Sequence, residues 1–441
     1  MYSKDIESRA KYILGSSSNR KIADLSKALN QNIDGYGVAT FEDINQFEEP
    51  KVKASQMRFN YSLPELQSLA NRSENSDDFY IFASSICGVE IDDDFALQYV
   101  GVPEEKTNRF LRAIITINDR PFTMRVVPNC WQKKNSIFAT NFHIRGNVLF
   151  LESQELGRIT SYCKLCSINN IAYISKNLNK ENVLCINPLQ YCGQACKFCL
   201  RTQDIYSRKK KNTLINLDPA QMCRFLISEL PDIEFGSLNE IYISTGRFTT
   251  KKDLLRFLKT FKNEVSNIWG DKFDPARNQN QWFKVSSHLL DTYEAMAEAK
   301  QYGVKKYLYP IEIISNSKRK AYMTHPSMRA NKGDVSFEGI LGILSQASNV
   351  FGIDKIEPVL IIGLDTYQDT MRGLRALKNG GYEILTHTVF RAYTEDQLQY
   401  YSMDLGEIVD VLAYIKNNFG FGYSQVVDLQ NKSVKKSYIE V

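Results

Sequence analysis

The sequence lacks the long hydrophobic runs that a membrane-spanning helix requires. No apolar stretch approaches the roughly 18–20 residues of a spanning helix, and the longest candidate, 359–364, has the length of a strand. The first residues also lack the apolar core of a signal peptide. We therefore expect a soluble, cytoplasmic protein without a membrane partner, in a reducing compartment.

The composition also lacks an excess of either charge. The 55 Lys and Arg residues and 50 Asp and Glu residues leave a net charge of +5 over 441 residues, which does not argue for a polyanionic partner. Hydrophobic residues at 43% and charged residues at 24% exclude a disordered, collagen-like or coiled-coil chain. The basic run 208–211 has no interleaved aromatic residues, so we interpret it as a solvated loop. Docking of RNA through this run stays an alternative.

Cysteine, in contrast, is plentiful and unevenly placed. Seven of the nine cysteines lie between Cys130 and Cys199, with Cys87 before them and Cys223 after them. A disulfide framework is typical of small secreted chains with an even number of cysteines, and this chain is neither small nor evenly bridged. The crowded thiols are therefore predicted to be metal ligands or reactive groups, and Cys87 and Cys223 to be core residues.

The sequence predicts an N-terminal α+β domain over 1–180, which ends in a possible metal-binding CxxC pair. It is followed by a barrel domain over 181–395 and by a C-terminal helix and tail over 396–441, packed on the barrel. In the first domain, short apolar runs rich in β-branched and aromatic residues indicate strands. These runs are 79–91, 113–117, 122–127, 136–144 and 148–151.

After residue 180 the pattern alternates between strand and helix. The predicted strands are 182–187, 239–245, 282–287, 304–314, 356–364 and 383–390. The predicted helices are 219–230, 251–265, 290–302, 334–351, 366–379 and 404–418. Six βα units in succession predict a parallel sheet, doubly wound or curved into a full or partial barrel. In either arrangement the chemistry is expected beyond the C-terminal strand ends.

The most specific motif is CxxxCxxC, formed by Cys192, Cys196 and Cys199 in the loop after the first of these strands. Thiolates are soft ligands that suit iron–sulfur clusters and zinc. Three protein ligands leave one coordination position open, which is what a catalytic metal requires. Structural zinc with a fourth ligand from elsewhere is the alternative.

Over roughly residues 180–395, about half of the chain, the sequence resembles the radical S-adenosylmethionine (radical SAM) superfamily. The motif, its place after the first strand, and Phe198 just before the third cysteine all match. The resemblance implies a partial (β/α)6 TIM-like barrel in which the three cysteines hold a [4Fe–4S] cluster. SAM would chelate the fourth iron, and its reductive cleavage would give a 5′-deoxyadenosyl radical that abstracts hydrogen from the substrate. A one-electron donor such as flavodoxin or ferredoxin is implied as a partner.

The resemblance also implies cofactor-binding positions near the strand ends. A Gly-Gly-Glu-like turn that receives the SAM amino group is represented by 244–246, where Arg247 replaces the acidic residue. The fourth and fifth strands are similar to those of the biotin-synthase-like and aromatic-amino-acid-lyase-like branches. The cofactor-binding residues implied in this way are Phe198, Ser244, Thr245, Gly246, Glu312, Arg319, Ile361 and Gly363.

A second metal site is a further hypothesis. Cys163 and Cys166 form a CxxC, and with Cys130 and Cys185 they would supply four thiolates for zinc or a second Fe–S cluster. A single CxxC is a weak signal, and Cys185 equally suits a small hydrophobic residue in a buried strand.

Few residues suit proton transfer, because the chain has only four histidines. His288, His325 and His387 fall near predicted C-terminal strand ends, and with Tyr309 they are the catalytic candidates. The expected substrate is a small molecule such as an amino acid, a sugar or a natural-product intermediate. Radical modification of RNA or a peptide is one alternative, and a non-enzymatic, zinc-stabilised binding protein is another.

Overall fold

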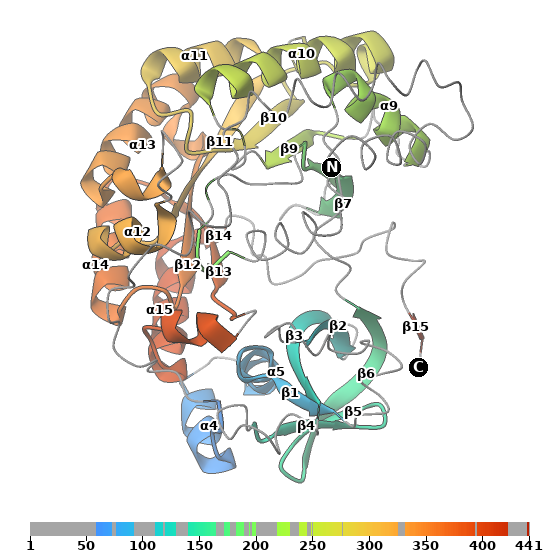
Figure 1. Ribbon diagram of the computed structural model, residues 1–441, viewed down its shortest axis with the longest axis vertical. Coiled ribbons are helices and arrows are strands. Elements are labelled where there is room, and N and C mark those ends of the chain that lie inside the picture. The colour runs from blue at the N-terminus through green and yellow to red at the C-terminus, as the bar shows by residue number, and fades with distance from the viewer. Residues whose placement is uncertain are drawn as a thin grey trace, which may run out of the picture.

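The protein is described by a computed structural model, in which two bodies are distinguished: a curled sheet covered by helices and a smaller β-barrel (Figure 1). The residues that the structure describes are 59–72, 76–91, 111–117, 120–128, 140–164, 172–176, 182–188, 194, 196–199, 218–229, 238–244, 248, 250–275, 277–324, 331–392, 395–421 and 439–440.

The smaller body is a sheet that closes on itself. Its strands run in the order β6-β2-β3-β1-β4-β5, and β5 pairs again with β6. β1 is parallel to β3 and β4, whereas the other pairs of this ring are antiparallel. The bounds are β1 Val89–Ile91, β2 Leu111–Ile117, β3 Arg120–Pro128, β4 Phe142–Arg145, β5 Val148–Leu151 and β6 Gln154–Lys164, with β15 Ile439–Glu440 added beside β6.

The predicted strand over 79–91 is wrong, because most of this run forms helix α5, Ser76–Cys87. Side chains all around the helix are buried, including Phe79, Ile81 and Ala83. A helix that is buried on all sides presents a continuous apolar run, and periodicity cannot distinguish it from a buried strand. The helix ends before Gly88, whose φ of +88° favours glycine.

The larger body is a partial barrel of parallel strands, as predicted. Its strands follow the order β8-β9-β10-β11-β12-β13-β14, each parallel to the next, and β7 is added antiparallel beside β8. The bounds are β7 Ala172–Lys176, β8 Asn182–Ile186, β9 Glu240–Ser244, β10 Trp282–Ser286, β11 Val304–Glu312, β12 Ile356–Ile362, β13 Ile384–Val389 and β14 Gly420–Phe421.

Helices cover the outer face of this curled sheet (Figure 1). All six predicted helices are present, as α9 Pro219–Glu229, α10 Lys251–Trp269, α11 Tyr293–Gln301, α13 Phe337–Phe351, α14 Tyr367–Asn379 and α15 Leu405–Asn418. The sequence did not predict α12, Asn316–Met323, or the short 3-10 turns. These turns are Gly270–Lys272, Lys332–Asp334, Ile353–Lys355 and Glu395–Tyr400.

The two bodies contact each other through α15 and the small helix α4, Leu63–Ala70. Arg72, just after α4, forms a salt bridge with Asp410 of α15. The main-chain N–H of Leu405 donates to the Tyr61 hydroxyl at 3.2 Å. These contacts place the smaller barrel beside the last helix of the larger one. Within the described residues, no helix combines the length and the apolar character that crossing a membrane demands.

Candidate active site

The inner face of the curled sheet, opposite its helices, carries a buried network of charges. Lys284 of β10 lies with its Nζ 2.6 Å from Glu357 of β12 and 4.0 Å from Glu240 of β9. Lys306 of β11 binds Glu240 at 3.2 Å. Burial by itself lowers the pKa of Lys284, but Glu357 and Glu240 outweigh it and leave the pKa raised. Two cations and two carboxylates therefore neutralise one another in the first half of the strands.

Residues nearer the C-terminal strand ends on this inner face are only half-buried. Side chains alternate between the faces of a strand, so those two and four positions beyond the charged residues share their face. They are Tyr242, Ser244, Ser286, Val359 and Ile361, and Thr388 joins them because it lies two positions beyond Thr386, whose hydroxyl bonds Glu357. Hydroxyl groups and two aliphatic side chains thus lie partly accessible toward the end of the barrel where the chemistry was predicted. Ser244 and Ile361, two of the predicted cofactor contacts, are among them.

Strand β11 ends at Glu312 in a sharp turn. The N–H of Ile313 donates to the carbonyl of Ile311 at 2.7 Å, which closes a γ-turn around Glu312 with a φ of +63°. A positive φ at a residue other than glycine is strained, and such strain is concentrated at functional sites. The register with β12 shifts at the same point. Because of this turn, the Glu312 side chain does not follow the alternation between the two faces that a regular strand would give it.

The carboxylate of Glu312 forms an ion pair with Lys332. The Lys332 Nζ lies 3.1 Å from both Glu312 oxygens. The side chain of Lys332 is 7% exposed and that of Glu312 is 18% exposed. The sequence analysis did not identify Lys332, because no motif or periodicity marks a residue that reaches its partner across twenty positions by tertiary folding. Lys332 is the main addition that the structure makes to the predicted site.

Arg319, one of the predicted cofactor contacts, is bonded to the main chain. Its Nη1 donates to the carbonyl of Ile313 at 2.9 Å and to that of Ile311. Its Nε donates to Val335 at 2.9 Å, and its Nη2 donates to Lys332 at 2.6 Å. Each of the three guanidinium nitrogens thus donates to at least one carbonyl oxygen, and Arg319 is 1% exposed. This arrangement holds both sides of the Glu312 turn, and Lys332 provides the nearest cation to Glu312 that the structure describes.

The cysteine loop contacts the end of the barrel. The N–H of Lys197 donates to the carbonyl of Tyr322 at 2.9 Å, and Gln397 Nε2 donates to the carbonyl of Lys197 at 2.9 Å. A turn brings the N–H of Cys199 to the carbonyl of Cys196 at 3.0 Å. Cys196 and the predicted cofactor contact Phe198 are buried, and Cys199 is half-buried. Cys192, Thr245 and Gly246 lie outside the described residues, so the three-cysteine site stays a prediction.

Gly363 follows β12 with a φ of +103°, which favours glycine. Its carbonyl accepts from the N–H of Ser402 at 2.8 Å. The nearest atoms to an added Cβ would be those of Phe390 at 3.6 Å, an ordinary contact. Backbone conformation, more than crowding, therefore explains the glycine, and its contact with the cofactor stays a prediction.

Two of the four catalytic candidates, His387 and Tyr309, lie on the helix side of their strands. Thr386 Oγ1 donates to Glu357 at 3.3 Å, which places Thr386 on the inner face and its neighbour His387 on the helix side of β13. Tyr309 alternates with Lys306 in the same way and faces the helices together with Tyr307. Burial lowers the pKa of His387 to about 4 and raises that of Tyr309 to about 12. We therefore leave His387 out of the proposed site, whereas the charges of Lys332 and Glu312 act on the Tyr309 phenol, whose catalytic role stays a prediction.

His288 lies two residues past the end of β10, buried at the correct end of the barrel. His325 lies outside the described residues. Whether either histidine takes part in catalysis stays a prediction.

The hypothesis of a second metal site joined four cysteines, and the two that the structure describes lie in different bodies. Cys163 pairs with Ile114 in the smaller barrel, whereas Cys185 is buried in β8 of the larger one. Cys130 and Cys166 lie outside the described residues. Among the residues that are described, no three His, Cys, Asp or Glu side chains are grouped to hold a metal ion. Cys87 and Cys223 are core residues, as expected.

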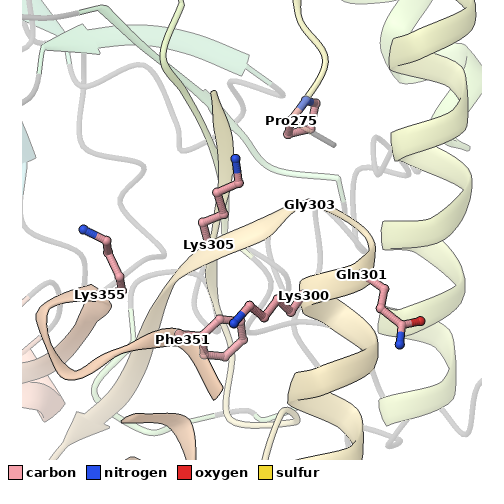
Figure 2. Close-up of a pocket in the computed structure, with 7 residues that line it drawn as sticks. All are labelled: Pro275, Lys300, Gln301, Gly303, Lys305, Phe351 and Lys355. Carbon is pink, nitrogen blue, oxygen red and sulfur yellow. The ribbon is translucent and has the colours of Figure 1, made fainter. Parts of the chain in front are cut away.

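A cavity of about 410 Å³ lies at the opposite end of the barrel, near the start of β11 (Figure 2). Three of its lining residues are lysines, but Figure 2 shows that Lys305 and Lys355 point in different directions. Lys305 Nζ binds the carbonyls of Asn278 and Gln281 at 3.0 and 2.9 Å, and Lys355 pairs with Asp354. These ammonium groups bind the protein itself, so we do not place the active site here.

No protein-family model and no curated protein matches the chain. Weak similarity to solved structures is found for HydG, the FeFe-hydrogenase maturase from Carboxydothermus hydrogenoformans (12% identity, 54% of this chain and 52% of that one, TM-score 0.37). Coproporphyrinogen III oxidase (HemN) from Escherichia coli, a radical SAM enzyme, is similar at 10% identity, over 57% of this chain and 60% of that one, with a TM-score of 0.35.

A third similar structure is Streptococcus suis SuiB bound to S-adenosylmethionine, at 11% identity over 55% of this chain and 51% of that one, with a TM-score of 0.36. This chain therefore covers less than two thirds of each of these structures. Because every TM-score is below 0.5, we base no argument on these similarities. The functional proposal rests on the residues of this chain.

Proposed function

We propose that the chain is a radical SAM enzyme that acts on a small molecule. In this proposal Cys192, Cys196 and Cys199 hold a [4Fe–4S] cluster, and SAM binds beside Glu312. The observation that supports it best is the Glu312–Lys332 ion pair at the same end of the barrel as the cysteine loop. A carboxylate and an ammonium 3.1 Å apart are complementary to the ammonium and carboxylate of an α-amino acid, which is the head group of SAM.

The residues present fit both groups chemically. Thiolates are the usual protein ligands of iron–sulfur clusters, and two of the three proposed ligands lie in one turn against the barrel. When held by the three cysteines, the cluster would supply the one-electron chemistry that cleaves SAM and removes a hydrogen atom from the substrate. A partner such as flavodoxin or ferredoxin would supply that electron.

The side chains of this protein bind and orient the reactants. Glu312 accepts hydrogen bonds from the ammonium of the ligand, and Lys332 donates to its carboxylate. Arg319 fixes the Glu312 turn, so that the carboxylate is held in place before the ligand arrives. The half-buried hydroxyls of Ser244 and Thr388 line the inner face and would hydrogen-bond a small polar substrate, and the Ser286 hydroxyl between them is bonded to Tyr242.

The proposal is tested by anaerobic reconstitution with iron and sulfide. We expect about four irons per chain, as a [4Fe–4S] cluster requires, and 5′-deoxyadenosine after reduction with dithionite in the presence of SAM. Cys196→Ser should lose the cluster and still fold. Cys223→Ser is the matched control, because Cys223 is a core residue of α9, a helix that packs against α10, and burial raises the pKa of its thiol to about 12. Tightly bound zinc in place of iron, or no 5′-deoxyadenosine, would contradict the proposal.

A further inference from the structure

We propose that Gln194 is a positioning residue, which sets the Lys332 ammonium against Glu312 and so links the cysteine loop to the site of the ligand's amino-acid head group. The inference rests on the proposed function and adds to it a residue between the first two cysteines of the motif.

The contacts run in one direct path. Gln194 is 1% exposed, and its Oε1 accepts a hydrogen bond from the main-chain N–H of Lys332 at 3.1 Å. The Lys332 carbonyl accepts from Arg319, and the Lys332 ammonium binds both Glu312 oxygens. Lys332 is therefore held by its N–H to the cysteine loop, by its carbonyl to α12 and by its side chain to the end of β11.

The surroundings leave Lys332 little freedom to adopt another position. A Cβ added to the next residue, Gly333, would lie 2.3 Å from Thr324 Oγ1 and 2.4 Å from the Arg319 carbonyl oxygen. The backbone of this turn thus packs directly against α12. Without the Gln194 oxygen, the Lys332 N–H would be buried without that acceptor, and a displacement of its backbone would carry the ammonium away from Glu312.

The path through Lys332 distinguishes Gln194 from other residues that hold the cysteine loop. Gln397 also contacts this loop with a buried side chain, and it donates to the carbonyl of Lys197. This bond ends on the backbone of Lys197, on the far side of Cys196 from Gln194, whereas the Gln194 bond ends on Lys332 itself. Gln397→Leu is therefore the matched control for Gln194→Leu, since each variant removes one side-chain hydrogen bond to or from this loop.

The experiment measures SAM binding by anaerobic calorimetry on oxidised, cluster-loaded protein, together with the iron content. We expect Gln194→Leu to retain the iron content of the wild type and to bind SAM about 5- to 30-fold more weakly, as the loss of one buried hydrogen bond predicts. Gln194→Glu keeps an acceptor oxygen and should restore binding. Gln397→Leu should bind SAM with the affinity of the wild type per loaded cluster.

A double-mutant cycle tests whether Gln194 acts through Lys332. Lys332→Met keeps the main-chain N–H and removes the ammonium, so adding Gln194→Leu to it should weaken SAM binding no further. Full additivity of the two losses would overturn the inference, and so would wild-type affinity in Gln194→Leu or loss of iron from that variant. If the wild-type protein loads iron but does not bind SAM, the proposed function fails and this inference fails with it.

Discussion

Replacing Lys284 by methionine should destabilise the barrel strongly. The Lys284 Nζ lies 2.6 Å from Glu357 and 4.0 Å from Glu240, and the side chain is 5% exposed. Its removal leaves Glu357 with the Thr386 hydroxyl at 3.3 Å and without its cation. Breaking a buried ion pair from one side costs about 3–5 kcal/mol, so we expect a loss of this size in the free energy of unfolding.

The assay is urea unfolding followed by far-UV circular dichroism at pH 7. The double variant Lys284→Met/Glu357→Gln removes both charges, and we expect it to recover about 1–3 kcal/mol of the loss. A loss below about 1 kcal/mol in Lys284→Met, or a double variant less stable than the single one, would refute the reasoning. Because the folded-state pKa of Lys284 is raised, its stabilisation should persist from neutral pH up to the ordinary lysine pKa and disappear as the pH rises through the folded-state value.

Three further predictions concern other buried groups. Burial raises the pKa of Asp365 to about 6 from 3.8, so the native state binds this proton more tightly and gains about 3 kcal/mol as the pH falls from 6 to 4. Asp365→Asn should remove this gain in unfolding experiments across that range. Burial lowers the pKa of His387 to about 4 from 6.5, so its contribution has the opposite sign: about 3 kcal/mol is lost as the pH falls from 6.5 to 4. His387→Gln should therefore lose less of its free energy of unfolding between pH 6.5 and pH 4 than the wild type. The same loss in both proteins would contradict this. Gly333→Ala should lower stability by about 1–3 kcal/mol through overpacking, whereas Gly342→Ala, where an added Cβ meets nothing within 4 Å, should not lower the melting temperature.

The barrel was predictable because the pattern of apolar residues differs between its strands and its helices. Residues typical of helix ends also separate these elements. The predicted strand 282–287 differs from β10 by one residue, and the predicted helix 366–379 differs from α14 by one. α12 was missed because it is short and polar and follows directly on the predicted end of β11. α5 was misassigned because it is buried on all sides.

Less of the site could be predicted, because its contacts are tertiary. Glu312 was found through the resemblance of its strand to a known family. The same resemblance implied Arg319, a few positions further on, as a cofactor contact, and its side chain is bonded to carbonyl groups. The ammonium beside Glu312 comes from Lys332, beyond α12, and no local pattern connects these two residues. The bond from Gln194 to Lys332 spans 138 positions and was equally inaccessible to sequence reasoning.

The γ-turn at Glu312 has a consequence for attempts to make this protein more heat-resistant. A residue held at positive φ costs about 1–3 kcal/mol, and glycine would relieve that cost at the backbone. A thermal-shift screen would therefore tend to favour glycine at this position. A stabilised variant with this change would lack the Glu312 carboxylate that we propose binds the ligand. Stability would then be gained at the expense of activity. Engineering of this chain should keep position 312 fixed or screen each variant for SAM binding as well as for melting temperature.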